Sequence, residues 1–193
     1  MSKQKNILNA DYALSRRITL AYIVKRPIKP WLQAIPGMFI IDFLIRTKEI
    51  RKYSQYYMYF RNLAMDIATA NINDQNKDDL VSQREDRIIE WLVTQNINHL
   101  SIRQAYVSLL DHLVKHYKRL LQSAEDKYRD MIEDAYQTWD KYNEYLSELA
   151  SIEKSIDQAI REQTDENLHE YYYRLTKQIE ADEQRKKELD EIF

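Results

Sequence analysis

The chain has 193 residues, among them 29 Lys and Arg, 31 Asp and Glu, one Gly, three Pro and no Cys, and its formal net charge is −2. One Gly and three Pro are too few for the tight turns of a β-sheet protein. The lack of Cys excludes disulfides and cysteine-ligated metal sites, and is typical of a reducing compartment. We therefore expect an all-α protein with a single core.

Charge is divided unevenly along the chain. Residues 1–62 carry 12 Lys and Arg against 3 Asp and Glu, whereas residues 63–193 carry 17 against 28. A basic, aromatic-rich region is attracted to anionic surfaces. We therefore expect residues 1–62 to form one basic end of an elongated molecule. Because the first residues alternate polar and apolar positions instead of forming a continuous apolar core, we expect a cytoplasmic protein, peripheral at most at the inner face of a membrane.

The first predicted region, 1–73, is helical, basic and rich in aromatic residues. Helical spacing of apolar residues predicts a helix over 10–25, which Pro27 must end. The segment 25–37 contains every Pro and the single Gly, so it is expected to be an extended connector. A long helix is predicted from 38 to about 70, where no helix-breaking residue occurs.

The second predicted region, 74–100, combines a linker with a short helix at about 80–95. Asn and Asp gather just before this helix, and both favour turns by bonding to nearby backbone. The third predicted region, 101–193, is a long antiparallel helical hairpin.

The apolar pattern of the third region predicts one continuous helix over 103–163. From Tyr106 to Ile160, 15 apolar steps cover 54 residues, an average of 3.6 residues per step. Such a helix would be roughly 90 Å long. A restart near Ser123 remains open, because acidic residues follow it.

A final helix is expected to pack against the long one as the second arm of a coiled-coil-like hairpin. Long amphipathic hairpins often dimerise, so self-association is an open possibility. The predicted seam between the two arms is formed by Tyr128, Trp139, Tyr142, Leu146, Leu149, Leu168, Tyr172 and Leu175.

The segment 31–45 is apolar on nearly all sides and is flanked by Lys and Arg. At 15 residues it is too short to cross a bilayer as one helix. Three interpretations remain open: an internal hydrophobic plug, an element that docks on an anionic membrane surface, or a contact with a protein partner. The candidate contact residues are Trp31, Phe39, Ile40, Phe43, Arg46, Arg51 and Lys52.

Four tyrosines, Tyr53, Tyr56, Tyr57 and Tyr59, lie among basic residues and are able to stack bases. No nucleic-acid-binding motif accompanies them, and the rest of the chain is acidic, so we do not expect nucleic acid as the partner. The more ordinary interpretation is that these rings cover a core edge with their hydroxyls in water.

An alternative to a contact surface is a metal-binding site. His112 and His116 are four residues apart, and His169 ends a Glu-x-x-His spacing. A di-metal bundle needs two such elements, and this chain has one. We therefore expect no metal and no cofactor.

Together these patterns predict a non-enzymatic helical scaffold or adaptor. Its expected partners are another protein, a second copy of the chain, or an anionic membrane surface, and no small-molecule substrate is expected. A helical metal-binding protein and a nucleic-acid-binding helical protein remain the alternatives.

Overall fold

The computed structural model describes residues 2–25, 38–73, 77–95, 99–163 and 168–193. In these residues the fold is all-α, as the composition predicts. Its helices are α1 (Lys3–Lys25), α3 (Met38–Ile72), α4 (Lys77–Thr94), α5 (Leu100–Gln122), α6 (Tyr128–Tyr136), α7 (Trp139–Gln163) and α8 (Leu168–Ile192).

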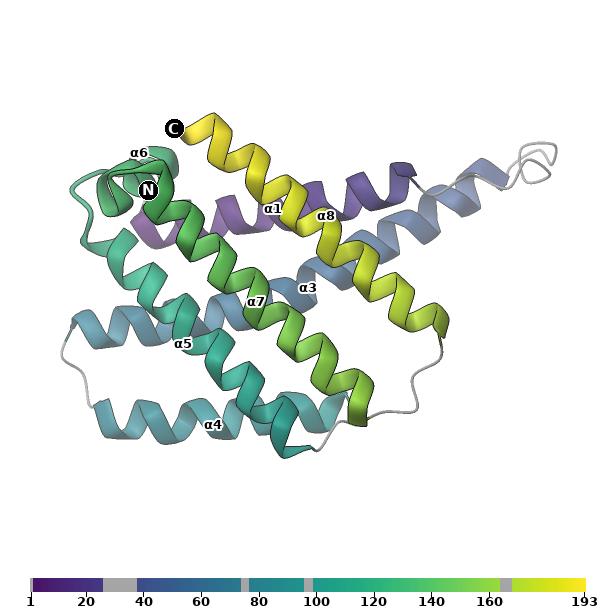
Figure 1. The fold of residues 1–193 in the computed structure, drawn as a ribbon, viewed down its shortest axis with the longest axis horizontal. Coiled ribbons are helices and arrows are strands. Elements are labelled where there is room, and N and C mark those ends of the chain that lie inside the picture. Colours follow the sequence, from purple (N-terminus) through teal and green to yellow (C-terminus); the bar gives the residue numbers. More distant parts are fainter. Residues whose placement is uncertain (1, 26–37, 74–76, 96–98, 164–167) are drawn as a thin grey trace.

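The six longer helices form two layers that cross each other (Figure 1). Helices α1, α3 and α4 make one layer, and α5, α7 and α8 make the other. Between the layers, α3 packs on α5 and α1 packs on α8. The short helix α6 lies at one end, against α1, α5, α7 and α8. Within each layer, consecutive long helices run in opposite directions: α1, α3 and α4 in one layer, and α5, α7 and α8 in the other (Figure 1).

One hydrophobic core joins all three predicted regions. The helix ends at Ile72 and Leu100 fall close to the predicted boundaries at 73 and 100, but no boundary divides the core. Every described helix contributes to it; examples are Ile7, Phe60, Ile88, Leu110, Ile132, Leu149 and Leu189. The three predicted regions therefore pack as one unit in the residues described.

The prediction of one continuous helix over 103–163 is wrong, because the chain breaks twice within it. Helix α5 ends with Ser123 as its C-cap, and α6 is separated from α7 at Gln137. Two bonds hold the first break: the Ser123 hydroxyl accepts from the Glu125 amide (3.1 Å), and the Asp134 carboxylate accepts from the Ala124 amide (3.0 Å). The chain then reverses, so α5 packs against α7 instead of extending it.

The prediction that residues 1–62 form one basic end of the molecule is wrong for α1. This helix lies between α3 and the acidic α8 rather than at the end of the bundle. Arg17 of α1 donates to Glu188 of α8 at 2.8 Å. Burial raises the pKa of Glu188 to about 7, and Arg17 only partly offsets that effect. Opposite charges from the two halves of the sequence thus meet inside the fold.

Helices α7 and α8, which carry most of the predicted hairpin seam, pack as antiparallel neighbours. Tyr142 and Leu149 are buried, and Tyr128, Leu146 and Leu175 are partly buried. Leu168 starts α8, but its side chain lies outside the described residues.

Two seam residues were placed wrongly. Trp139 is 42% exposed, because it is the first residue of α7 and projects beside the turn. Tyr172 is 60% exposed, because the adjacent Tyr173 is the residue that α8 turns inward, toward Tyr22 of α1.

We predict that Tyr142→Ala and Trp139→Ala have different effects on stability. Tyr142 is only 3% exposed, so its truncation removes buried contacts and leaves a cavity, at a cost of about 3–5 kcal/mol. Trp139→Ala changes an exposed side chain and should cost less than about 1 kcal/mol. Urea unfolding of both variants checks this, and equal losses would contradict it.

The turn between α6 and α7 has an unusual backbone. Gln137 has φ 66°, a left-handed value that glycine adopts more readily than other residues. Its amide donates to the Glu133 carbonyl at 2.8 Å and closes α6. The turn therefore stores a small strain at a position where the sequence contains no glycine.

We expect Gln137→Gly to raise the free energy of unfolding by up to about 1 kcal/mol, because glycine relieves the left-handed strain. Gln137→Val should lower it, since a β-branched residue is disfavoured at positive φ. Thermal melting of the two variants distinguishes the outcomes. A stabilising Val or a strongly destabilising Gly would show that the turn has another conformation.

Candidate functional site

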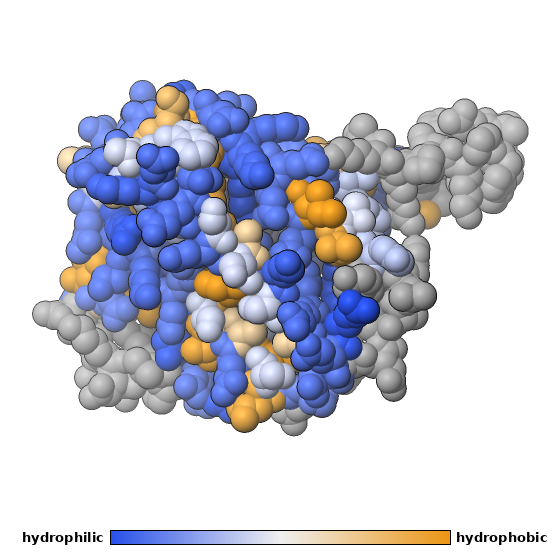
Figure 2. All heavy atoms as spheres, in the orientation of Figure 1, coloured by the Kyte–Doolittle hydropathy of each residue, from blue (hydrophilic) through white to orange (hydrophobic). Residues whose placement is uncertain are grey.

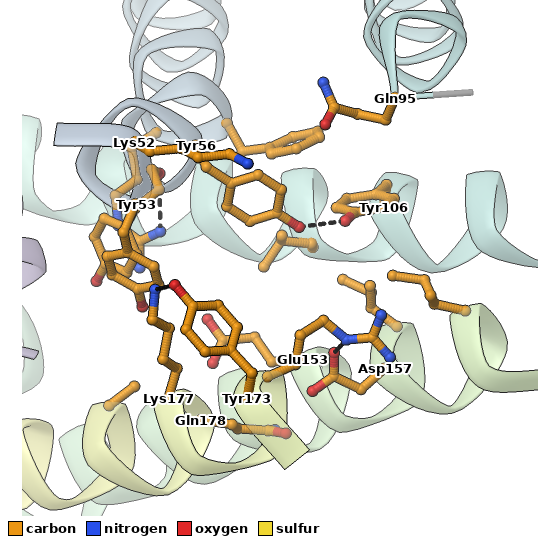
Figure 3. A pocket seen from close by; sticks show the side chains of 18 of the residues that line it. Lys52, Tyr53, Tyr56, Gln95, Tyr106, Glu153, Asp157, Tyr173, Lys177 and Gln178 are labelled. Carbon is orange, nitrogen blue, oxygen red and sulfur yellow. Dashed lines mark hydrogen bonds and ion pairs between the residues drawn. The ribbon is translucent and has the colours of Figure 1, made fainter. Parts of the chain in front are cut away.

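A cavity of about 380 Å³ lies between α3 and the α7–α8 pair (Figure 3). It forms because α3 packs on α1 and α5, while α7 and α8 pack on each other, so α3 and α8 stand apart. Side chains from α4 and α5 close one end. We refer to this cavity as the cleft; α3, α4, α5, α7 and α8 all contribute to its lining.

Aromatic side chains form most of the α3 side of the cleft. Tyr53, Tyr56, Tyr57 and Phe60 follow the spacing i, i+3, i+4 and i+7, which places them on one helix face. Tyr106 of α5 meets this face.

Stacking and a hydrogen bond hold the aromatic end of the cleft in place. The Tyr106 ring stacks on Phe60 with 4.7 Å between centroids, and its hydroxyl lies 2.5 Å from that of Tyr56 (Figure 3). Trp91 of α4 packs edge-on against Tyr106 at 5.2 Å. Because these rings restrain one another, this end is preorganised for a flat apolar group.

A buried ammonium group lies at the opposite end of the cleft. Lys177 of α8 is 7% exposed, and its Nζ lies 4.1 Å from the ring centroid of Tyr173 and 4.7 Å from that of Tyr53. The Lys177 ammonium donates to the Tyr173 hydroxyl at 2.5 Å, and that hydroxyl donates to Glu49 at 3.3 Å. Cation–π attraction compensates part of the cost of burying this charge.

The carboxylates on the α7 side of the cleft are held by arginines. Arg185 binds both oxygens of Glu153 at 2.7 Å, and Arg174 contacts Asp157 at 3.2 Å. Burial opposes ionisation of Glu153, but Arg185 outweighs it and lowers the pKa of this carboxyl below its usual value. A carboxylate held in this way is a poor proton acceptor.

Tyr57 brings a buried hydroxyl to the cleft. Its side chain is 6% exposed, and the Arg61 guanidinium lies 3.3 Å from its ring centroid. Among the described residues, no group forms a hydrogen bond with this hydroxyl. A buried polar group without a partner costs about 1–3 kcal/mol. A bound ligand can recover that cost by bonding to Tyr57.

A buried network beneath the cleft positions Arg61. Its Nε donates to Asp11 of α1 at 3.3 Å, and the Tyr117 hydroxyl of α5 donates to the same carboxylate at 2.5 Å. Burial raises the pKa of Asp11 despite both contacts. The network ties three helices together directly behind the ring of Tyr57.

Of the seven contact residues predicted from the sequence, three have described side chains. Trp31 lies outside the described residues, as do the side chains of Phe39, Ile40 and Phe43. Arg46 donates to the Ile23 carbonyl at 3.3 Å. Arg51 and Lys52 are both exposed, but only Lys52 lines the cleft (Figure 3).

The remaining members of the cleft escaped the sequence analysis. Sequence spacing singled out the tyrosines of α3, but Tyr106, Tyr173 and Lys177 come from distant parts of the chain. No local pattern connects them with α3, so only the packing of the helices reveals the site.

The two histidines singled out as metal ligands lie in an aromatic stack. The rings of His112 and His116 stack on Tyr145, with centroids 4.7 and 4.2 Å away. His116 Nδ1 bonds to the Tyr136 hydroxyl at 2.7 Å, and burial lowers the pKa of His116 to about 3. The side chain of His169 lies outside the described residues. Within those residues, no three His, Asp or Glu side chains are placed to hold a metal ion.

We predict that stability falls with acid partly through His116. Its folded pKa lies near 3 and its unfolded pKa near 6.5, so the stabilisation is present above pH 6.5 and is lost as the pH falls toward 3. His116→Gln removes this titration. Between pH 7 and pH 4 the wild type should lose about 3 kcal/mol more than the variant, measured by urea unfolding. Parallel losses would contradict the prediction.

The face in Figure 2 is mostly hydrophilic, with separated groups of apolar residues. In the described part of the chain, no helix combines the length and apolar character needed to cross a bilayer.

Comparisons with protein-family models, with curated proteins and with solved structures find no match to this chain. The function must therefore be argued from the cleft itself.

Proposed function

We propose that this protein is a non-enzymatic helical adaptor that binds a segment of a partner protein in the cleft. The buried Tyr57 hydroxyl, which has no hydrogen-bond partner in the residues described, carries this proposal. Cores are expected to satisfy such groups, and sites that receive a ligand leave them open.

The chemistry of the lining supports recognition of a protein. Tyr and Trp dominate the energetics of protein interfaces, because they supply a large apolar area together with a hydrogen-bonding group. The cleft combines both residue types in Tyr56, Tyr106 and Trp91, which already restrain one another. A partner side chain that enters there meets a surface requiring little rearrangement.

The lining of the cleft continues beyond the cavity, which favours a polypeptide over a small molecule. On α3, Ile45, Glu49, Lys52 and Tyr56 follow one another at i, i+4, i+7 and i+11, so they share one face. Ile45 is exposed and lies one turn outside the cleft. A bound segment can therefore contact Ile45 while its anchor side chain fills the cleft.

The same end of α3 also supports docking on an anionic membrane surface, in a cytoplasmic, peripheral location. Leu44 and Ile45 are exposed, as are Lys48 and Arg51 on the following turns. Apolar and basic residues in this arrangement suit the boundary between headgroups and acyl chains. Co-sedimentation with phosphatidylserine vesicles tests this second role, and a Leu44→Ser, Ile45→Ser variant should lose it.

Tyr56→Ala is expected to weaken peptide binding by at least about tenfold, because Tyr56 is an accessible ring of the cleft. Dodecamer peptides are selected from a display library on the immobilised full chain, and affinities are then measured by fluorescence anisotropy. Tyr12→Ala is the matched control: Tyr12 of α1 is 47% exposed, close to the 43% of Tyr56, and lies outside the cleft.

Circular dichroism and melting curves verify that both variants fold. If the selected peptides bind equally to the wild type and to Tyr56→Ala, the cleft is not the binding site. Light scattering of the same samples reports whether the chain self-associates and whether Tyr56→Ala changes that association.

A further inference from the structure

We infer that the cleft selects an acidic segment with an aromatic or branched apolar anchor. The inference rests on the proposed function and adds the chemistry of the partner. The anchor occupies the aromatic end formed by Tyr56, Tyr106 and Trp91, and an acidic side chain of the same segment pairs with Lys52.

The positive charge of the entrance comes from three cations of α3. Lys48, Arg51 and Lys52 are exposed, and none of them forms an ion pair with another residue in the described parts of the chain. We call these three residues the basic rim. Lys52 alone of the three also lines the cleft, so it is the rim cation nearest to a bound segment (Figure 3).

The acidic residues that line the cleft neutralise little of the positive charge of the basic rim. Glu153 and Asp157 are paired with Arg185 and Arg174. Glu49 lies beside the rim, and its carboxylate accepts the Tyr173 hydroxyl. Among the described residues that line the cleft, one carboxylate thus lies beside the three cations of the basic rim, and these groups together give the entrance a positive field.

The spacing along α3 sets the spacing within the partner segment. Lys52 and Tyr56 are four residues apart on a helix, which corresponds to about 6 Å along its axis. An extended segment covers that distance in about two residues, and a helical segment in about four. The acidic side chain and the apolar anchor are therefore two to four positions apart.

The buried Tyr57 hydroxyl completes the recognition. Tyr57 lines the cleft beside Tyr53, with 5.8 Å between the ring centroids, and its hydroxyl can bond to a backbone carbonyl or amide of the segment. A backbone bond of this kind does not depend on the side chain of the partner. Charge at Lys52 and the shape of the aromatic end therefore provide the specificity.

Charge reversal at Lys52 tests the inference. Peptides selected on the wild-type chain should carry an acidic residue two to four positions from Trp, Phe or Leu. Lys52→Glu should weaken these peptides at least about fivefold, because one attraction becomes a repulsion. A new selection on Lys52→Glu should enrich Lys or Arg at the same position.

Arg51→Glu is the matched control for this experiment. It changes the net charge by the same amount, lies next to Lys52 and does not line the cleft. Because Arg51 contributes to the field of the basic rim but does not line the cleft, its reversal should weaken the selected peptides by no more than about twofold, clearly less than Lys52→Glu. Equal effects of the two reversals would overturn the inference, because they would indicate a general field rather than a contact at Lys52.

The two proposals fail in different ways. Peptides that lose binding in Tyr56→Ala but are neutral or basic, and are insensitive to Lys52→Glu, would overturn the acidic segment and leave the adaptor function intact. Peptides insensitive to Tyr56→Ala would overturn both. A fluorescent dT12 oligonucleotide that binds more tightly than the peptides, and depends on Tyr56, would replace the acidic segment with nucleic acid.

Discussion

The arrangement of the two helical layers depends on a buried ion pair between Asp11 of α1 and Arg61 of α3. Together with the Tyr117 hydroxyl it joins α1, α3 and α5, and so ties the two helical layers to each other. Removing one member of such a buried pair leaves an uncompensated charge, at a cost of about 3–5 kcal/mol. Because Arg61 also lies over the ring of Tyr57, the interaction that holds the layers together shapes one side of the cleft.

Local chemistry was sufficient to predict most helices but not their breaks. The helix from Met38 to Ile72 matches the prediction of 38 to about 70, because Pro36 and Gly37 precede it and a polar run follows. The breaks after Gln122 and at Gln137 contain neither Gly nor Pro. They arise because α5 and α7 both bury their apolar stripes in one core, which outweighs the strain at Gln137. A spacing of 3.6 residues continues through such breaks, so periodicity could not reveal them.

The inward face of α8 was harder to predict, because it is largely polar. Lys177, Glu180, Arg185 and Glu188 are all buried. A search for apolar spacing instead selected Tyr172, which faces solvent. Lys177 is stabilised by tyrosine rings and Arg185 by Glu153 of α7, partners that only the tertiary structure supplies. The sequence therefore indicated the part of the candidate site formed by the tyrosines of α3, but not the part formed by α8.

The position of α8 determines when the cleft can form during protein synthesis. Helix α8 lies between α1 and α7, so it packs against a helix that is synthesised well before it. Chains emerge from the ribosome starting at the N-terminus, and α1 and α3 can pair long before α8 exists. The cleft needs Tyr173 and Lys177, and thus does not exist on the growing chain. In the proposed function, the cleft can receive a partner only after α8 has been synthesised and has packed against α1 and α7.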